Sequence, residues 1–522
     1  MKSCPQCKTE YADETLNFCL EDGSSLITAL AVGADHLTAI LSGGPGEERT
    51  LVYSSNGSHE TSVGNSIAVL PFVNMSADVD NEYFCDGLAE ELLIALAKID
   101  DLKVAARTAA FSFRGKNVPM AEIGRTLNVK TVLEGSVRKA GDRVRITIQL
   151  INAEDGYHLW SERYDRDMQD IFEIQDEITL AVVDALKVKL LAPEKRAMLK
   201  RHTNDPEAYQ LYLRGRYFFY KRTPEGFIKA IECFEKAIER DENYALAVSG
   251  LADSYVFQGF YEMISPQDAA AKVGPLVKRA VALDETSSET NTSRALEKTL
   301  YEWEHRESLN YFRAAIAADP KYALAYHLES AVSVALGDYE SSIAAEKKAI
   351  EIDPFTPVFN ASLAWWYYIA GRNEEAIEHC KRTIEIAPNH FFAYWILGLA
   401  YAIEGSHSDA VVAFQRAVAL NQFEAHVRAD LARVFAVMGE KEEALAILKE
   451  FEEEAATKYV SPVNQAKIYL GLGEDERVIE LIQEACEQRA VRLTYLLIDP
   501  ILNHLKDDPR IQETRRRVGI AV

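Results

Sequence analysis

The sequence predicts a multidomain chain with three folded parts: a small cysteine-bearing head, a mixed α/β domain and a long all-α array of repeated helical pairs. Three cysteines close to the N-terminus indicate the head. Segments with strand-like alternation and segments with helix-like spacing follow one another in the middle of the chain, which is typical of an α/β domain. Glycines, prolines and alanines that recur every 34 residues indicate the array.

Composition limits the class of protein. A chain of 522 residues exceeds what one hydrophobic core usually organises, so several domains are expected. The formal net charge of -24 argues against a surface that neutralises the phosphates of nucleic acids or lipids. No apolar segment follows Lys2, and the apolar stretch at 26–42 is short and carries Asp35 and His36. We therefore expect no secretory signal, no membrane span and a reducing, cytoplasmic location.

The head is predicted to occupy residues 1–26. Cys4 and Cys7 form a C-x-x-C pair, and Cys19 with Asp22 forms a second C-x-x-ligand pair, so four side chains can surround one ion tetrahedrally. This spacing resembles a small bacterial zinc ribbon, which implies one structural Zn²⁺ with aspartate as a harder fourth ligand. The alternatives are a ribbon that has lost its metal and a redox C-x-x-C, although no βαβ pattern surrounds the cysteines.

A linker and the α/β domain come next. Residues 43–66 are rich in Gly, Ser, Asn and charge, which favours a flexible linker, and the linker is predicted to span 27–65. Residues 66–191 are expected to form the α/β domain, in which Asp155-Gly156 marks a hairpin turn. The elements predicted in this domain are a strand at 67–72, a helix at 86–99, an alternating strand at 142–153, its hairpin partner after Gly156, and a helix at 170–190.

Four stretches of this domain resemble a known family. They are IAVLPFVNMS (67–76), YFCDGLAEELLIAL (83–96), LEGSVRKAGDRVRITIQLINAEDG (133–156) and LWSERYDR (159–166). Together they resemble the TolB amino-terminal-like (FlgO-like) domain of bacterial signalling and adaptor chains. The resemblance implies a binding or assembly module without an established reaction, often followed by tetratricopeptide repeats.

Three acids in this domain suggest an alternative. Asp86, Glu90 and Glu91 could hold Mg²⁺ or share proton transfer, which would indicate a signalling enzyme. We favour a structural role, in which Asp86 caps the start of a helix and the glutamates lie in its first turn. No phosphate-binding loop, zinc-protease, esterase or kinase signature is present, so the chain is predicted not to be an enzyme.

A connecting segment at 192–205 leads into the array at 206–522. Three residue types keep a 34-residue interval. They are Gly337, Gly371, Gly405 and Gly439, then Pro320, Pro354 and Pro388, then Ala376, Ala410 and Ala444. The interval predicts one helix-turn-helix unit repeated, with glycine ending the first helix and alanine where helices cross.

One unit carries a specific resemblance. Its matching residues are Tyr394, Leu397, Gly398, Tyr401, Gly405, Ala410, Phe414 and Ala417. They resemble the tetratricopeptide repeat, with Gln422 at the position where that repeat has proline. Weaker copies on both sides give about eight units with degenerate ends, and an insertion at 259–275 breaks the interval.

The register also predicts a binding surface. In this repeat the first helix of each pair lines the inner surface of the array. Its expected side chains form an aromatic strip for a protein or peptide partner, made of Trp365, Tyr368, Phe392 and Trp395, with His426 and Arg433 as polar guides. The equally weighted alternative is that these rings are intramolecular core, because aromatic stripes at helical spacing usually are.

These observations favour a non-catalytic adaptor or scaffold that holds a protein partner. The first alternative is a signalling enzyme or a regulatory subunit of one, associated with a cyclase or a kinase. The second is a transcription regulator that binds DNA through the head. Because acids outnumber lysines within the head, we expect no nucleic-acid ligand.

Overall fold

The computed structural model describes residues 65–78, 81–421 and 425–520, together with three short strands before residue 29. The chain divides into two compact units, Met1–Ser58 and His59–Val522. In the first unit the strands form an antiparallel sheet in the order β2-β1-β3. Their bounds are β1 (Lys2–Ser3), β2 (Glu10–Tyr11) and β3 (Ile27–Thr28). The predicted zinc ligands Cys4, Cys7, Cys19 and Asp22, and nearly all of the predicted linker, lie outside the described residues.

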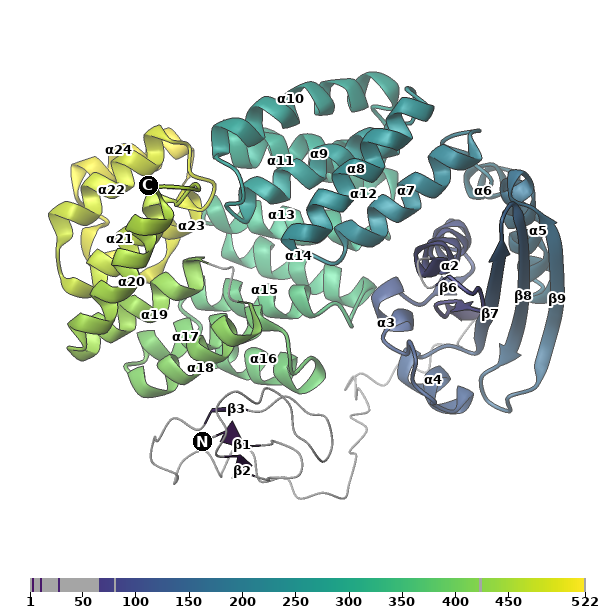
Figure 1. Ribbon diagram of the computed structural model, residues 1–522, viewed down its shortest axis with the longest axis horizontal. Helices are drawn as coiled ribbons and strands as arrows, with labels where there is room; N and C mark the ends of the chain where they lie inside the picture. Colours follow the sequence, from purple (N-terminus) through teal and green to yellow (C-terminus); the bar gives the residue numbers. More distant parts are fainter. Residues whose placement is uncertain are drawn as a thin grey trace. The chain divides into compact units, whose positions relative to one another are not determined.

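The second unit contains a mixed sheet with the strand order β6-β4-β7-β8-β9, in which β5 also pairs with β7 (Figure 1). β4 runs parallel to β6 and β7, whereas β7, β8 and β9 are antiparallel neighbours. The bounds are β4 (Ser66–Val69), β5 (Val73–Asn74), β6 (Lys103–Val104), β7 (Thr131–Ala140), β8 (Arg143–Asn152) and β9 (His158–Asp167). The predicted hairpin is confirmed, and Gly156 in its turn has φ +73°, which favours glycine.

Helices cover both faces of this sheet. The alternating residues of β8, from Val144 to Leu150, pack on one face with α2 (Glu82–Ala97) and α5 (Ile171–Ala185). The other face packs against α3 (Arg107–Phe111) and α4 (Met120–Leu127). The 3-10 turn η2 (Met168–Asp170) precedes α5, and α6 (Ala192–Met198) follows it. The predicted strand at 142–153 is confirmed, because its hydrophobic alternation matches the buried face. The helix predicted at 170–190 is present but ends at Ala185, and Lys187 has φ +55°, which is not helical.

One detail of the predicted helix at 86–99 is wrong. α2 begins at Glu82, with Asn81 at its N-cap position, so Asp86 lies inside the helix and not at its start. Asp86 and Glu90 are buried. Asp86 and Glu90 therefore do not cap the helix, and as buried acids they need partners elsewhere in the chain.

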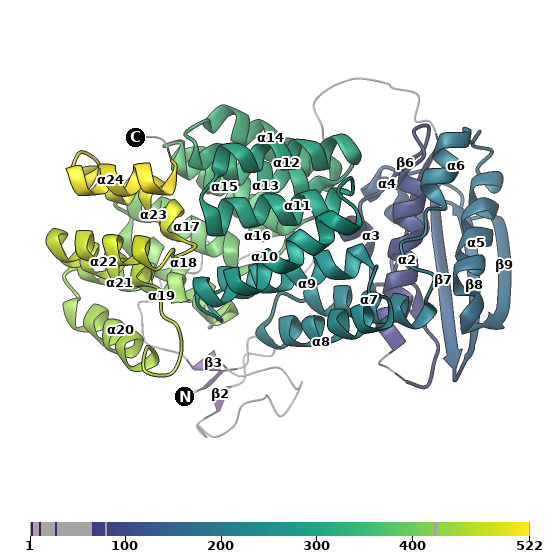
Figure 2. The same ribbon diagram turned by 90° about the horizontal axis from the view of Figure 1, so that it is seen from above.

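The rest of the described chain is helical, and α7 to α22 form eight consecutive helical pairs within it (Figures 1 and 2). The first four pairs are α7 (Pro206–Phe219) with α8 (Pro224–Arg240), α9 (Ala245–Phe260) with α10 (Pro266–Leu283), α11 (Ser288–Glu297) with α12 (His305–Ala318), and α13 (Ala323–Ala335) with α14 (Tyr339–Ile352). The last four are α15 (Pro357–Ile369) with α16 (Asn373–Ile386), α17 (Phe391–Ile403) with α18 (His407–Leu420), α19 (Ala425–Met438) with α20 (Lys441–Glu454), and α21 (Pro462–Leu472) with α22 (Asp475–Glu487). α23 (Leu493–Ile498), the 3-10 turn η4 (Pro500–Leu505) and α24 (Pro509–Val518) end the array.

The 34-residue interval has the expected physical cause. Gly337, Gly371, Gly405 and Gly439 follow the first helices of their pairs and have φ between +75° and +89°. Gly473, one interval later, has φ +77° and continues the series. This left-handed conformation ends a helix at little cost only for glycine. The alanines of the series are fully buried where helices cross, so both parts of the prediction are confirmed.

The insertion predicted at 259–275 falls within the second pair, from the end of α9 to the middle of α10, which contains Pro275. α11 starts 43 residues after α9, whereas α15 starts 34 residues after α13, so the second pair is longer and the interval fails there. Within the third pair a π-helical turn, η3 (Lys298–Glu302), extends α11 before α12 begins.

Two sets of contacts join distant parts of the second unit. The core beneath α2 and α5 continues into α7, α8 and α9, where Leu213 packs against Gly87. At the other end, Asn464 of α21 donates a hydrogen bond of 2.8 Å to Glu262, and Arg489 donates one of 2.7 Å to the Tyr301 carbonyl. The eighth pair is therefore bonded back to the second and third pairs. No helix among the described residues is long and apolar enough to cross a membrane.

Candidate functional site

The first helices of three consecutive pairs bring the predicted partner-binding residues together. The six residues are Trp365 and Tyr368 on α15, Phe392 and Trp395 on α17, and His426 and Arg433 on α19. The Trp365 ring centroid lies 5.2 Å from that of Trp395 and 5.8 Å from that of Phe392. The His426 ring packs edge-on against Trp395 at 4.6 Å. The structure therefore brings the rings of the predicted strip together.

The aromatic strip is covered by the chain itself. Tyr495 of α23 lies 4.8 Å from Trp365, and the Tyr368 hydroxyl donates a hydrogen bond of 2.6 Å to Asp499. Trp365 is 6 % exposed, Trp395 2 % and Tyr368 0 %. These side chains are intramolecular core in this structure, and a role for them in partner binding stays a prediction.

A buried charge cluster adjoins the aromatic strip. Asp430 accepts hydrogen bonds of 2.8 Å from the Trp395 indole and from Lys467. The Arg433 Nε lies 3.6 Å from the other Asp430 oxygen. Burial alone would raise the pKa of Asp430, but the charges of Lys467 and Arg433 outweigh it and lower that pKa below its usual value. Asp430 is therefore ionised and holds the two cations at the inner surface.

Sequence reasoning missed two members of this cluster. Lys467 lies one 34-residue interval after Arg433, so the register itself could have found it. Asp430 lies between apolar positions of α19, where an acid signals a buried partner.

Burial lowers the pKa of His426 well below its usual value, and the positive charges of Arg492 and Lys467 lower it further. His426 is therefore neutral and its ring packs against Trp395, and its role as a polar guide stays a prediction.

The three acids of α2 form the second candidate site, at the junction of the sheet and the first helical pair. Asp86 is bound by Arg114, and Glu90 by Arg216 and, at 3.0 Å, by Arg107. Each of these two carboxylates therefore has a cationic partner, which is the usual condition for burying a charge.

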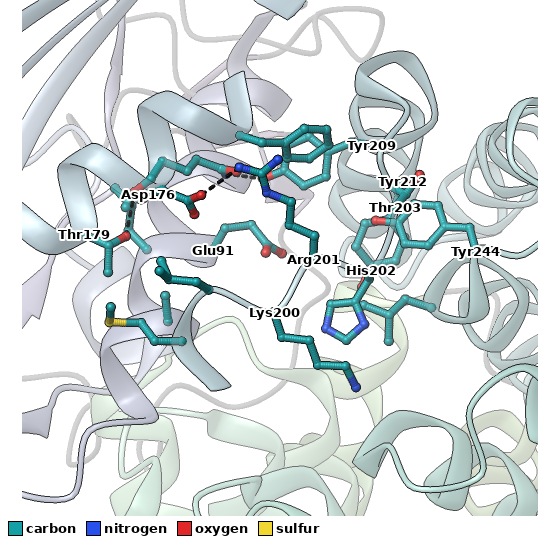
Figure 3. Close-up of a pocket in the computed structure, with 17 residues that line it drawn as sticks. Glu91, Asp176, Thr179, Lys200, Arg201, His202, Thr203, Tyr209, Tyr212 and Tyr244 are labelled. Carbon is teal, nitrogen blue, oxygen red and sulfur yellow. Dashed lines mark hydrogen bonds and ion pairs between the residues drawn. The ribbon is translucent and has the colours of Figure 1, made fainter. Parts of the chain in front are cut away.

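Glu91 points into a cavity of about 70 Å³ between α2, α5 and α7 (Figure 3). Burial raises the pKa of Glu91 to about 7, although the charge of Arg216 opposes this rise. Burial also lowers the pKa of His202, which lines the same cavity. One water occupies roughly 10–15 Å³ of such a cavity, so this cavity has room for a few waters and not for a metabolite. The junction is built to join two parts of the chain.

The described residues contain no group of three or more His, Cys, Asp or Glu side chains placed to hold a metal ion. The predicted Mg²⁺ alternative for Asp86, Glu90 and Glu91 therefore has no support in their arrangement. The four cysteines in the described part, Cys85, Cys233, Cys380 and Cys486, are buried and form no disulfide.

Two family models match parts of the chain. Residues 63–181 match the second domain of HilA/YgeH-like transcriptional regulators. Residues 304–357 and 362–425 match a tetratricopeptide repeat family. The chain therefore contains tetratricopeptide repeats, and the prediction made from the 34-residue interval is confirmed. The resemblance to the TolB amino-terminal-like domain stays a prediction.

Among curated relatives, "Putative adenylate cyclase 3" of Rhizobium meliloti is 43% identical over 187 residues, which are 36% of this chain and 32% of that protein. Anaphase-promoting complex subunit 3 of Schizosaccharomyces pombe is 29% identical over 149 residues, 28% of this chain and 22% of that protein. This chain thus spans about a third or less of the length of these relatives.

Solved structures with a similar arrangement include a thermophilic tetratricopeptide protein of Thermus thermophilus. It is 17% identical, covers 37% of this chain and 99% of its own, and has a TM-score of 0.33. IFIT1 with Gppp-AAAA is 14% identical, covers 67% of this chain and 88% of its own, and has a TM-score of 0.44. The expectation that this chain binds no nucleic acid stays a prediction.

Proposed function

We propose that this chain is a non-catalytic adaptor that holds a protein or peptide partner on its tetratricopeptide array. The observation that carries the proposal is the regular series of helical pairs, in the last five of which a glycine with positive φ follows the first helix at the same interval. Stacked pairs of this kind present a continuous, preformed helical surface, which suits reversible binding without bond chemistry. The tetratricopeptide family match over 304–357 and 362–425 supports it.

The inner surface of the array is the proposed binding surface. In the described structure α23 and Asp499, which directly follows it, occupy this surface, because Tyr495 packs on Trp365 and Asp499 accepts a hydrogen bond from Tyr368. A partner that uses the aromatic strip must therefore replace these two contacts. A ligand with one aromatic and one acidic side chain can do so.

The junction acids support the absence of catalysis. Arginines already bind the oxygens of Asp86 and Glu90, which leaves these carboxylates poorly available to a metal ion. We expect the purified chain to produce no cyclic AMP from ATP and Mg²⁺. Turnover that Glu90→Gln abolishes would refute the non-catalytic assignment.

Binding is tested with the full chain as bait for proteins from a lysate of the producing organism. Each captured protein is then purified and titrated into the chain by calorimetry, beside Tyr495→Ala and the exposed control Tyr339→Ala. We expect Tyr495→Ala, which loosens α23, to tighten binding, and the control to leave it unchanged. If no captured protein binds the purified chain, the adaptor proposal fails. Binding that Tyr495→Ala leaves unchanged would place the partner elsewhere on the array.

A regulatory subunit of a signalling enzyme is the second candidate, favoured by the 43% identity to a protein named as an adenylate cyclase. It predicts that the added chain changes the rate of a cyclase from the same organism. A transcription regulator is the third candidate, favoured by the family match of residues 63–181. It predicts DNA binding that weakens as salt rises.

We also propose that Cys4, Cys7, Cys19 and Asp22 hold one structural Zn²⁺. Their spacing supports the proposal, and the described residues contain no competing cluster. Metal analysis of the full chain should give one zinc per molecule, and Cys4→Ser with Cys7→Ser should remove it. Cys380→Ser, at a buried cysteine far along the chain, is the matched control. Zinc that persists in the double variant would refute the assignment.

A further inference from the structure

A concave pocket of about 410 Å³ lies on the surface where the start of α2 meets α7 and α8. Four cations line it, in two pairs. Arg214 and Lys221 are seven residues apart on and just after α7, and Lys229 and Lys236 are seven residues apart on α8. Residues seven apart share one face of a helix and are separated by about 10 Å. The pocket therefore has two parallel rows of positive charge.

Aromatic rings, and not carboxylates, contact three of these cations, Arg214, Lys221 and Lys229. The Arg214 guanidinium lies 5.7 Å from the centroid of the Phe218 ring, and Lys229 Nζ lies 5.2 Å from the same centroid. Lys221 Nζ lies 4.4 Å from the centroid of Tyr217. None of the four cations forms an ion pair with a described residue. Cation–π contacts orient a cation without neutralising it, so the charges stay available to an anionic ligand.

The acids of the pocket offset only part of this charge, because two glutamates line it beside four cations. Of the two glutamates that line it, Glu82 is already bound by Arg114 at 2.8 Å. Glu232 is the other. The pocket is thus a local excess of positive charge on a chain whose net charge is -24. A positively charged pocket on an acidic chain favours a negatively charged partner segment. The segment must be short, because a longer one would also meet the surrounding acids.

We propose that this basic-aromatic pocket binds an acidic segment of a partner protein. Carboxylates of the segment pair with the two rows of cations, and an apolar side chain lies on Leu211 and Phe218 between them. A nucleic acid fits less well, because its backbone would continue beyond the pocket over the exposed acids Glu225 and Glu239 of α8. The pocket is separate from the inner surface of the array and gives the chain a second contact surface.

The test measures fluorescence anisotropy of a labelled peptide of glutamates interrupted by leucine, titrated with the full chain. A peptide with glutamine at each glutamate position is the ligand control. The acidic peptide should bind and weaken with added salt, since screening acts on exposed charges. Lys229→Glu with Lys236→Glu should weaken binding by about ten-fold or more.

Two matched double variants serve as controls. One changes the net charge of the chain away from this pocket, and the other replaces the pocket lysines but keeps their charge. Lys441→Glu with Lys449→Glu makes the same charge change on exposed positions of α20 and should leave binding unchanged. Lys229→Arg with Lys236→Arg should retain binding. Equal affinity of the wild type and the Lys229/Lys236 charge-reversal variant would overturn the proposal. Tighter binding of inorganic phosphate or of a labelled oligonucleotide through the same lysines would overturn it too.

Discussion

Replacing Glu91 by Gln should stabilise the protein above neutral pH and change little near pH 4. Burial holds the pKa of Glu91 at about 7 in the folded chain, against an ordinary value of 4.5. Between these two pH values the unfolded chain has released a proton that the folded chain still holds. The free energy of unfolding therefore falls as pH rises from 4.5 to 7, and the full cost is present above 7.

The size of the effect follows from the same two values. At about 1.4 kcal/mol for each tenfold change in proton affinity, the buried carboxylate costs about 3 kcal/mol at pH 8. A neutral amide of the same shape does not carry this cost. The cavity beside Glu91 leaves room for a water to satisfy the new amide.

Urea unfolding followed by circular dichroism, at about pH 4 and about pH 8, measures the difference. Glu225→Gln, at an exposed acid of α8, is the control and should behave like the wild type at both values. A Glu91→Gln chain that is no more stable than the wild type at the higher pH would refute the reasoning. So would an equal gain at both pH values, because the gain would then not depend on ionisation.

Three further substitutions test the packing that was described above. Arg216→Met should lower the free energy of unfolding by about 1.5–3 kcal/mol, because buried Glu90 then keeps only Arg107 as its partner. Adding Glu90→Gln should recover part of the loss in urea unfolding. Gly398→Ala should lower the free energy of unfolding by about 1–3 kcal/mol, since a Cβ there would lie 2.7 Å from the Phe414 ring. If adding Phe414→Leu does not restore the melting temperature of the Gly398→Ala chain, the clash with Phe414 is not the cause. Trp365→Ala should cost about 3–5 kcal/mol as a buried ring, and a variant that melts like the wild type would contradict its place in the core.

The repeat array could be predicted because its signal is local. A glycine with positive φ ends a helix by its own backbone geometry, so Gly371 and Gly405 reveal the interval without knowledge of any distant contact. The same holds for β8, where alternation of Val144 with polar neighbours fixes which face is buried. The positions of Trp365 and Trp395 followed from that register.

The surroundings of the two sites could not be predicted, because they depend on distant segments. Asp86 has the neighbours of a capping residue, but its partner Arg114 is 28 residues away and the helix starts earlier. Tyr368 is covered by Asp499 from 131 residues away. Local spacing places a side chain on a surface, and only the packing of the whole chain decides what lies against that surface.

The bonds from the last helical pair back to the second and third restrict how the array responds to force. An open solenoid stretches by small rotations between neighbouring repeats. Here such rotations must first break the Asn464–Glu262 and Arg489–Tyr301 hydrogen bonds. Pulling on both ends of the chain in an optical trap should therefore give one initial rupture and then stepwise release of helical pairs, in place of gradual elastic extension.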